Sequence, residues 1–174
     1  MSPTLGEIGI KSIPEFFAKY LLLSAQRTGV DSPVFISIGS GNCDLEIEVA
    51  KELLARGLHH FKIQCLEISS EMLARGEVSA RQINLQNHFE FIQADFNTWH
   101  INSIYDGVMA NQSLHHVTEL EHLFLQLKRS LHEDGSFVIS DMVGRNGQQR
   151  WPEALSLVHK YWTELPKEKN IMYC

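Results

Sequence analysis

The stretch VFISIGSGNCDLEIEVAKELL, Val34 to Leu54, places a short apolar strand, a turn with two glycines and a helix in direct succession. The helix is indicated by Leu45, Val49 and Leu53, which recur at helical spacing. Glycines in such a turn permit positive φ and let a ligand approach the backbone, and the start of the helix offers unpaired N–H groups. The same glycines also suit a tight turn that binds nothing, so the stretch alone leaves both interpretations open.

Strands and helices continue to alternate after this stretch. Because helices separate the strands, the pattern predicts a doubly wound α/β fold, a parallel sheet of about five strands covered by helices. Ligands bind at the carboxyl ends of the strands in such folds, which places the glycine turn at the expected site. The further strands are KIQCLEI, FEFIQAD, YDGVMAN and SFVISDM. The further helices are SIPEFFAKYLLLSAQ, SSEMLARGEVSARQI with an interruption at Gly76, TELEHLFLQLKRSL before a turn at HEDG, and PEALSLVHKYWTEL.

Two helix starts carry a capping pattern. Ser12 with Glu15, and Thr118 with Glu121, have the spacing of a capping box, in which the first side chain accepts a hydrogen bond from a backbone N–H of the first turn. We therefore expect helices to begin next to Ser12 and Thr118.

The composition restricts the class of protein and its partners. The chain has 174 residues, the size of one domain, with 44% hydrophobic and 21% charged residues and a net charge of −6. This balance, with no basic cluster among aromatics, argues against nucleic acid as a partner. No apolar run is long enough to span a bilayer, and no signal peptide is visible at the N-terminus. Cys43, Cys65 and Cys174 match no metal or redox spacing, so we expect a reduced, cytoplasmic protein without a metal site or membrane contact.

Polar side chains follow several of the predicted strands. A dinucleotide-binding turn would carry a third glycine or alanine where this chain has Asp44, whose carboxylate would repel a pyrophosphate. An NAD-dependent oxidoreductase is therefore disfavoured, and a nucleoside ligand without phosphates is favoured. Glu67 ends the second strand, near the roughly 20-residue spacing at which an acid binds ribose hydroxyls. Asp95 ends the third strand as a possible acceptor for an adenine amino group, and ANQSLHH ends the fourth.

From Val34 to Val143 the chain resembles the class I S-adenosylmethionine-dependent methyltransferases, a Rossmann-like family with seven strands. FISIGSGNCD is similar to the glycine motif of that family, CLEIS to its ribose-binding acid motif and FIQADF to its adenine-contacting motif. YDGVMANQSLHHV looks like its fourth-strand motif, and LKRSLHEDGSFVISD like its helix–turn–strand ending. The resemblance implies S-adenosylmethionine as cofactor and methyl transfer as the reaction.

The resemblance also implies a set of cofactor-binding residues. The glycine turn would line the methionine and ribose part, and the acid would bind the ribose hydroxyls while its neighbour packs on the adenine. The third strand end would accept from the adenine amino group and contact the ring edge, and the fourth would contact the methionyl amine. In that order the residues are Gly39, Ser40 and Gly41; Glu67 and Ile68; Asp95 and Phe96; and Asn111.

The glycine motif departs from the family pattern in two positions. The family has an acid two residues before the first glycine, where this chain has Ser37, and a glycine where this chain has Cys43. The missing acid predicts a weaker hold on the ammonium group of the cofactor. Asp44, Glu46 and Glu48 are interpreted as the solvated start of the following helix.

The family's sheet continues past the fifth strand with an antiparallel hairpin for which this chain has no sequence. We therefore expect residues 1–33 to form an N-terminal helical cap and residues 34–174 a cofactor-binding domain without its C-terminal hairpin. The fifth strand would then be an exposed edge that pairs either with a second copy, in a homodimer, or with a missing partner segment. A non-catalytic cofactor-binding or assembly module is the alternative to an enzyme.

Methyl transfer needs a base only where the acceptor loses a proton in the reacting step. His115 and His116, after the fourth strand, and Asp141, after the fifth, are the candidates, with His116 and Asp141 selected as catalytic. Purely structural roles are the alternative: one histidine packs under the next helix while the other caps it, and Asp141 caps a turn. Arg145 and Arg150 either bind an anionic substrate or are solvated. We expect a small-molecule acceptor because no basic surface points to nucleic acid.

Overall fold

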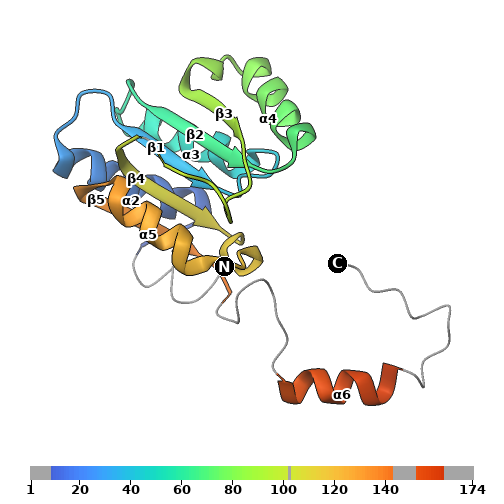
Figure 1. Cartoon of the computed structure of the whole chain (residues 1–174). Coiled ribbons are helices and arrows are strands. Elements are labelled where there is room, and N and C mark those ends of the chain that lie inside the picture. The colour runs from blue at the N-terminus through green and yellow to red at the C-terminus, as the bar shows by residue number, and fades with distance from the viewer. Residues whose placement is uncertain (1–8, 102, 143–151, 163–174) are drawn as a thin grey trace.

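The computed structural model describes residues 9–101, 103–142 and 152–162. Five parallel strands form one sheet in the order β3-β2-β1-β4-β5 (Figure 1), so the predicted doubly wound α/β fold is confirmed. The strands are β1 (Val34–Ile38), β2 (Lys62–Glu67), β3 (Phe89–Gln93), β4 (Tyr105–Asn111) and β5 (Leu131–Ser140). The helices are α2 (Ile13–Thr28), α3 (Asp44–Ala55), α4 (Ser70–Gln82), α5 (Leu120–Ser130) and α6 (Pro152–Trp162), with 3-10 turns η1 (Gln86–His88) and η2 (Leu114–His116).

The sheet separates two hydrophobic cores. One core joins β1 and β2 to residues of α2, α3 and α4, and the other joins β1 and β4 to α5. Figure 1 shows α5 on the opposite side of the sheet from α2 and α3. Chain order changes direction between β1 and β4, which places the switch point of the sheet beside the glycine turn.

The described part of the predicted N-terminal cap is a core helix. α2 begins after Ser12, whose Oγ accepts from the N–H of Glu15 at 3.3 Å, and ends at Gly29 in the left-handed conformation. Leu21 is fully buried against the sheet. A Cβ on Gly107 of β4 would lie 2.7 Å from Leu21 Cδ2, so the absence of a side chain there lets α2 approach the strand.

Two element boundaries differ from the sequence prediction. α4 is continuous through Gly76, which is buried in its middle, so the predicted interruption was wrong. α5 begins after Glu119, which makes no side-chain cap, so the capping box at Thr118 was also wrong. Oδ1 of Asn97, in the loop after β3, accepts from the N–H groups of Thr118 and Glu119 instead, at 2.9 and 3.2 Å.

The predicted turn at HEDG lies within β5 as an irregularity. Tyr105 pairs with Leu131 and Gly107 pairs with Ser136, so β5 gains three residues on β4 between these pairs. Residues 132–135 therefore bulge from the ladder before regular pairing resumes. Of the described helices, none is long and apolar enough to cross a membrane.

Candidate active site

The carboxyl ends of β1, β2 and β4 enclose a cavity of about 310 Å³, within the size range of small-molecule sites. A second cavity, of about 320 Å³, lies by the amino ends of β2 and β3, next to His59, His60 and His88. We assign the site to the first cavity because open α/β sheets bind ligands at the carboxyl ends of their strands. Its lining residues are Gly39, Glu67, Ile68, Phe96, Gln112, Ser113 and His116.

The two glycines of the turn have different functions. Gly39 has φ +69° and donates its N–H to the carbonyl of Leu66 at 2.9 Å. A Cβ on Gly39 would lie 2.6 Å from the Cβ of Ser113, so the close approach of the turns that follow β1 and β4 requires a glycine there. Gly41 has φ +56°, and a Cβ on it would meet no atom within 4 Å. The backbone at Gly41 therefore faces open space that a ligand can occupy.

Cys43 stands where the family motif has a glycine, and it keeps a glycine-like backbone. Its φ is +60°, in the left-handed region, and its side chain is fully buried at the start of α3. A Cβ on Gly76 of α4 would lie 2.8 Å from Cys43 Sγ and 2.9 Å from the carbonyl oxygen of Asn42. The turn thus carries a thiol where the family has no side chain, and α4 makes room for it with a glycine.

Glu67 is held in place at the wall of the cavity by two backbone groups. Oε2 accepts from the N–H of Gly41 and Oε1 from the N–H of Ser69, both at 3.0 Å, and the residue is only 9% exposed. A carboxylate has about four acceptor positions. Two positions therefore have no partner among the described residues and stay open for hydroxyl groups of a ligand, and the exposed Ile68 lines the same cavity.

The remaining predicted cofactor residues divide into those that line the cavity and those that border it. Phe96 lines it, and its Cε1 would lie 3.7 Å from a Cβ on Gly39. Oδ1 of Asp95 accepts from the backbone and side-chain N–H groups of Asn97, both at 2.9 Å. Asn111 ends β4 in register with Ser140. The predicted residues that do not line the cavity are Ser40, Gly41, Asp95, Asn111 and Asp141.

Asp141 organises the turn that follows β4. Its Oδ2 accepts from the N–H groups of Ser113 and Leu114 at 2.8 and 2.7 Å, and its Oδ1 from Met142 N–H at 2.7 Å and from Nδ1 of His115 at 2.6 Å. Burial alone would raise the pKa of Asp141, but these hydrogen bonds outweigh it, and the pKa lies below its ordinary value. A carboxylate occupied in this way is a poor general base, so the structure favours the turn-capping alternative over a catalytic role.

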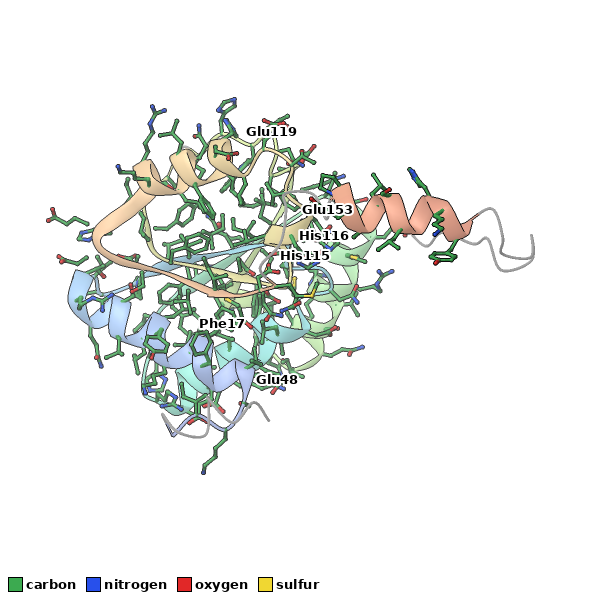
Figure 2. The ribbon with its side chains drawn as sticks, turned by 90° about the horizontal axis from the view of Figure 1, so that it is seen from below. Phe17, Glu48, His115, His116, Glu119 and Glu153 are labelled. Carbon is green, nitrogen blue, oxygen red and sulfur yellow. The ribbon has the colours of Figure 1, made fainter. Side chains whose placement is uncertain are left out.

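The two histidines lie next to each other in η2 (Figure 2), but their exposure differs. The side chain of His115 is 10% exposed and is fixed by Asp141, whereas His116 is exposed and lines the cavity. Their ring centroids are 4.1 Å apart. His116 is therefore the imidazole that a molecule in the cavity can reach.

The expectation that Glu46 is solvated was wrong. Glu46 is 3% exposed on the inner face of α3, and its Oε1 accepts from Ser37 Oγ at 2.5 Å. Its other oxygen, Oε2, is buried and has no hydrogen-bond partner among the described residues. The pKa of Glu46 is raised to about 7, chiefly by burial and to a smaller extent by the charges of Asp44 and Glu67, although hydrogen bonds from Ser37 and the backbone lower it.

Sequence reasoning missed three residues of this region. Gln112 has φ +50°, and no feature of the sequence indicates that backbone strain. Ser113, which donates from Oγ to the carbonyl of Ile38 at 2.6 Å, lies within the ANQSLHH cluster but was not singled out. Glu46 lies three residues before Val49 and seven before Leu53, so helical spacing already placed it on the buried face.

A methyltransferase-domain family model matches residues 31–173 of the chain. The chain therefore belongs to the methyltransferase domain family, and the resemblance seen in its motifs is confirmed. A search of curated proteins gave no match. In the part of the chain that the structure describes, no cluster of three or more His, Cys, Asp and Glu residues is arranged to hold a metal ion.

Three solved structures illustrate the fold. A putative S-adenosylmethionine-dependent methyltransferase from Methanococcus maripaludis has a TM-score of 0.56 at 24% identity, over 90% of this chain and 71% of that one. Coclaurine N-methyltransferase bound to N-methylheliamine and S-adenosylhomocysteine has a TM-score of 0.54 at 22% identity, over 71% of this chain and 35% of that one. The [4+2]-cyclase SpnF has a TM-score of 0.58 at 22% identity, over 78% of this chain and 50% of that one. The chain thus spans half or less of the latter two proteins.

Proposed function

We propose that the chain binds S-adenosylmethionine in the 310 Å³ cavity and transfers its methyl group to a small-molecule acceptor. Membership of the methyltransferase domain family supports the reaction class. The observation that carries the cofactor assignment is Glu67, a carboxylate fixed beside the glycine turn with two acceptor positions directed at no other described residue.

The residues of the cavity fit such a cofactor. Ile68 and Phe96 supply apolar surface for an adenine ring, and outside the lining, where Gly41 N–H donates to Glu67, open space leaves room for a ligand against the backbone. Glu67 would hold the ribose hydroxyls. When bound, S-adenosylmethionine supplies an electrophilic methyl group on a sulfonium, and the protein contributes positioning of the two reactants.

His116 is the residue that we propose to contact the acceptor. It is exposed at the cavity, so it can accept a proton where the acceptor carries one on the reacting atom. For an acceptor that is already deprotonated, the same imidazole would orient the acceptor. Asp141 would act on it only indirectly, by fixing the turn from Ser113 to His116.

A non-catalytic cofactor-binding or assembly module is the second candidate. SpnF, which has a similar fold, is a cyclase, so the fold alone does not determine methyl transfer.

A reduced, cytoplasmic setting without nucleic acid also belongs to the proposal: Cys43 and Cys65 are buried free thiols, and the net charge is negative. We further propose that β5, the edge of the described sheet, pairs with a second copy of the chain.

Calorimetric titration with S-adenosylmethionine and S-adenosylhomocysteine tests the cofactor site. Glu67→Ala removes a charged acceptor of two ribose hydroxyls, and hydrogen bonds to a charged group contribute about 1.5–3 kcal/mol each. We expect both ligands to bind the wild type and to bind Glu67→Ala at least about tenfold more weakly. Glu71→Ala, an exposed glutamate in the first turn of α4, is the matched control and should bind as the wild type does.

Transfer of a labelled methyl group separates the two candidate functions. Label moving from S-adenosylmethionine to a small-molecule acceptor supports the enzyme, and binding without transfer to a broad panel of amines, phenols and acids supports the non-catalytic module. Absence of binding by folded wild type at millimolar ligand would overturn the cofactor assignment itself.

A further inference from the structure

Glu46 has a buried carboxyl group of which only one oxygen has a hydrogen-bond partner among the described residues. One oxygen accepts from Ser37, and the other is enclosed without a partner among the described residues. An unsatisfied buried polar atom is costly, and an unpaired buried charge is far more costly. Ser37 is the penultimate residue of β1, two residues before Gly39, so its hydrogen bond holds this carboxyl group close to the glycine turn, buried beside the cavity and outside its lining.

Among the described residues, the ionisable side chains that act on Glu46 are acidic or neutral. Asp44 of its own helix and Glu67 of β2 act on it as like charges. Cys65, also of β2, faces it too, but burial raises the pKa of that thiol well above its ordinary value, which keeps it neutral. In the described residues no lysine, arginine or histidine forms an ion pair with Glu46. Within the described ranges, a proton is therefore the only counter-charge available to Glu46.

We propose that Glu46 is the acidic group that recognises the cationic end of the ligand, and that it releases its proton to solvent when the ligand binds. This inference rests on the proposed function, because S-adenosylmethionine carries a sulfonium and an ammonium group. The ligand's positive charge replaces the proton, so Glu46 becomes a carboxylate and one H⁺ leaves. Ser37 and Glu46 form a pair in which the strand supplies the hydroxyl and the helix supplies the acid.

The pair of Ser37 and Glu46 bears on the first departure from the family's glycine motif, the serine at position 37. The resemblance places an acid at position 37, and its absence predicted a weak hold on the ammonium group. The structure brings a carboxyl group to within 2.5 Å of the Ser37 hydroxyl from the next helix. Under this proposal Glu46 supplies, from the neighbouring helix, the acid that position 37 lacks.

Proton linkage makes the inference measurable on the wild-type chain. The pKa of Glu46 is about 7 in the free protein, and a nearby cation lowers the pKa of a carboxyl group. Between pH 6 and pH 7 the dissociation constant for S-adenosylmethionine should therefore fall about fivefold. Titration at pH 6 in buffers of different ionisation enthalpy should detect release of close to one proton. This window stays below the ordinary pKa of an α-amino group, so the ammonium of the ligand remains charged.

Three variants and a second ligand assign the proton to Glu46. Glu46→Gln should bind S-adenosylmethionine more weakly at pH 7 and lose the pH dependence, whereas Glu48→Gln, exposed on the same helix (Figure 2), should keep both. The exchange variant Ser37→Asp with Glu46→Ser should recover binding. Methylthioadenosine, a neutral nucleoside with neither cationic group, should bind wild type and Glu46→Gln alike at both pH values.

The outcomes separate this inference from the proposed function. No binding of S-adenosylmethionine by folded wild type at any pH would overturn the proposed function. Binding that is independent of pH, without proton release, would overturn the role of Glu46 alone. A pH dependence that persists in Glu46→Gln would belong to the cavity-lining His116 and would also overturn it. Where Glu46→Gln fails to fold, His116→Gln decides: proton release that persists in this variant supports Glu46, and proton release that disappears overturns its role.

Discussion

Glu46 also ties the stability of the free protein to pH. Its pKa is about 7 in the fold and 4.5 ordinarily, so the folded state keeps a proton that the unfolded state loses across this window. The free energy of unfolding from this group should therefore fall as pH rises from 4.5 to 7, by about 3 kcal/mol, and stay low above pH 7. In urea denaturation we expect Glu46→Gln to match the wild type near pH 5 and to be more stable at pH 8. A difference that is the same at both pH values would contradict this.

A comparison of alanine substitutions at Gly39 and Gly57 distinguishes the cost of a close contact from the cost of backbone strain. Both have positive φ, +69° and +89°, but a Cβ would collide with Ser113 only at Gly39. Alanine in the left-handed region costs about 1–2 kcal/mol, and overpacking adds roughly 1–3 kcal/mol. Thermal unfolding should therefore show Gly39→Ala to be clearly less stable than Gly57→Ala. Equal losses would mean that Ser113 moves aside freely.

Single residues of the site were predictable to different degrees. Gly39 and Glu67 could be found because strand ends and family motifs mark them, and the structure places both at the cavity. The bond between Ser37 and Glu46 could not be found, because it depends on how α3 docks against β1. Whether each predicted residue binds the cofactor stays a prediction.

At the scale of elements, the docking of α2 on the sheet depends on Gly107. A Cβ there would lie 2.7 Å from Leu21 Cδ2 and 3.0 Å from Phe35 Cδ1. Gly107→Ala should therefore lower the free energy of unfolding by about 1–3 kcal/mol. Leu21→Ala alone should cost about 2–5 kcal/mol, but it vacates the space that the new methyl group needs.

A double-mutant cycle of these two changes checks the contact. The double variant should be more stable than the sum of the single losses predicts, with a coupling energy of about 0.5–3 kcal/mol. Strict additivity, measured by urea denaturation, would show that α2 is held by other contacts.

Element order was predictable from alternating patterns, and element boundaries were less so. Gly76 was interpreted as a break, but its lack of a side chain serves contact with Cys43 inside a continuous helix. Thr118 has the spacing of a capping box, but its N–H donates to Oδ1 of Asn97, in the loop after β3, instead of to a glutamate of its own helix. Both errors arise from contacts that are distant in sequence, which local patterns do not report.

At the scale of the whole molecule, β5 is the element that can join two copies. It is ten residues long and has a partner on one side only within the described sheet. We expect a dimer that dissociates on dilution, measured by light scattering after gel filtration. Ile139→Lys, at an exposed position of β5, should shift it to monomer, whereas Leu125→Lys, exposed on α5, should not. A wild type that stays monomeric at all concentrations would exclude this interface.

The parallel sheet and the edge that carries the cavity followed from the sequence, because alternating elements and right-handed crossovers leave few topologies. The acceptor did not, because its contacts depend on the shape of the cavity rather than on any motif.

Neighbouring elements pack closely against the glycine turn on two sides, because glycines at the contacts have no side chain. Gly39 lets Ser113 of the β4 turn close in from one side, and Gly76 lets α4 press on Asn42 and Cys43 from the other. A loop confined in this way has lost most of its conformational entropy when the chain folds. A ligand that enters the cavity therefore meets a surface already in its final shape, and little of its binding free energy is spent on ordering the protein.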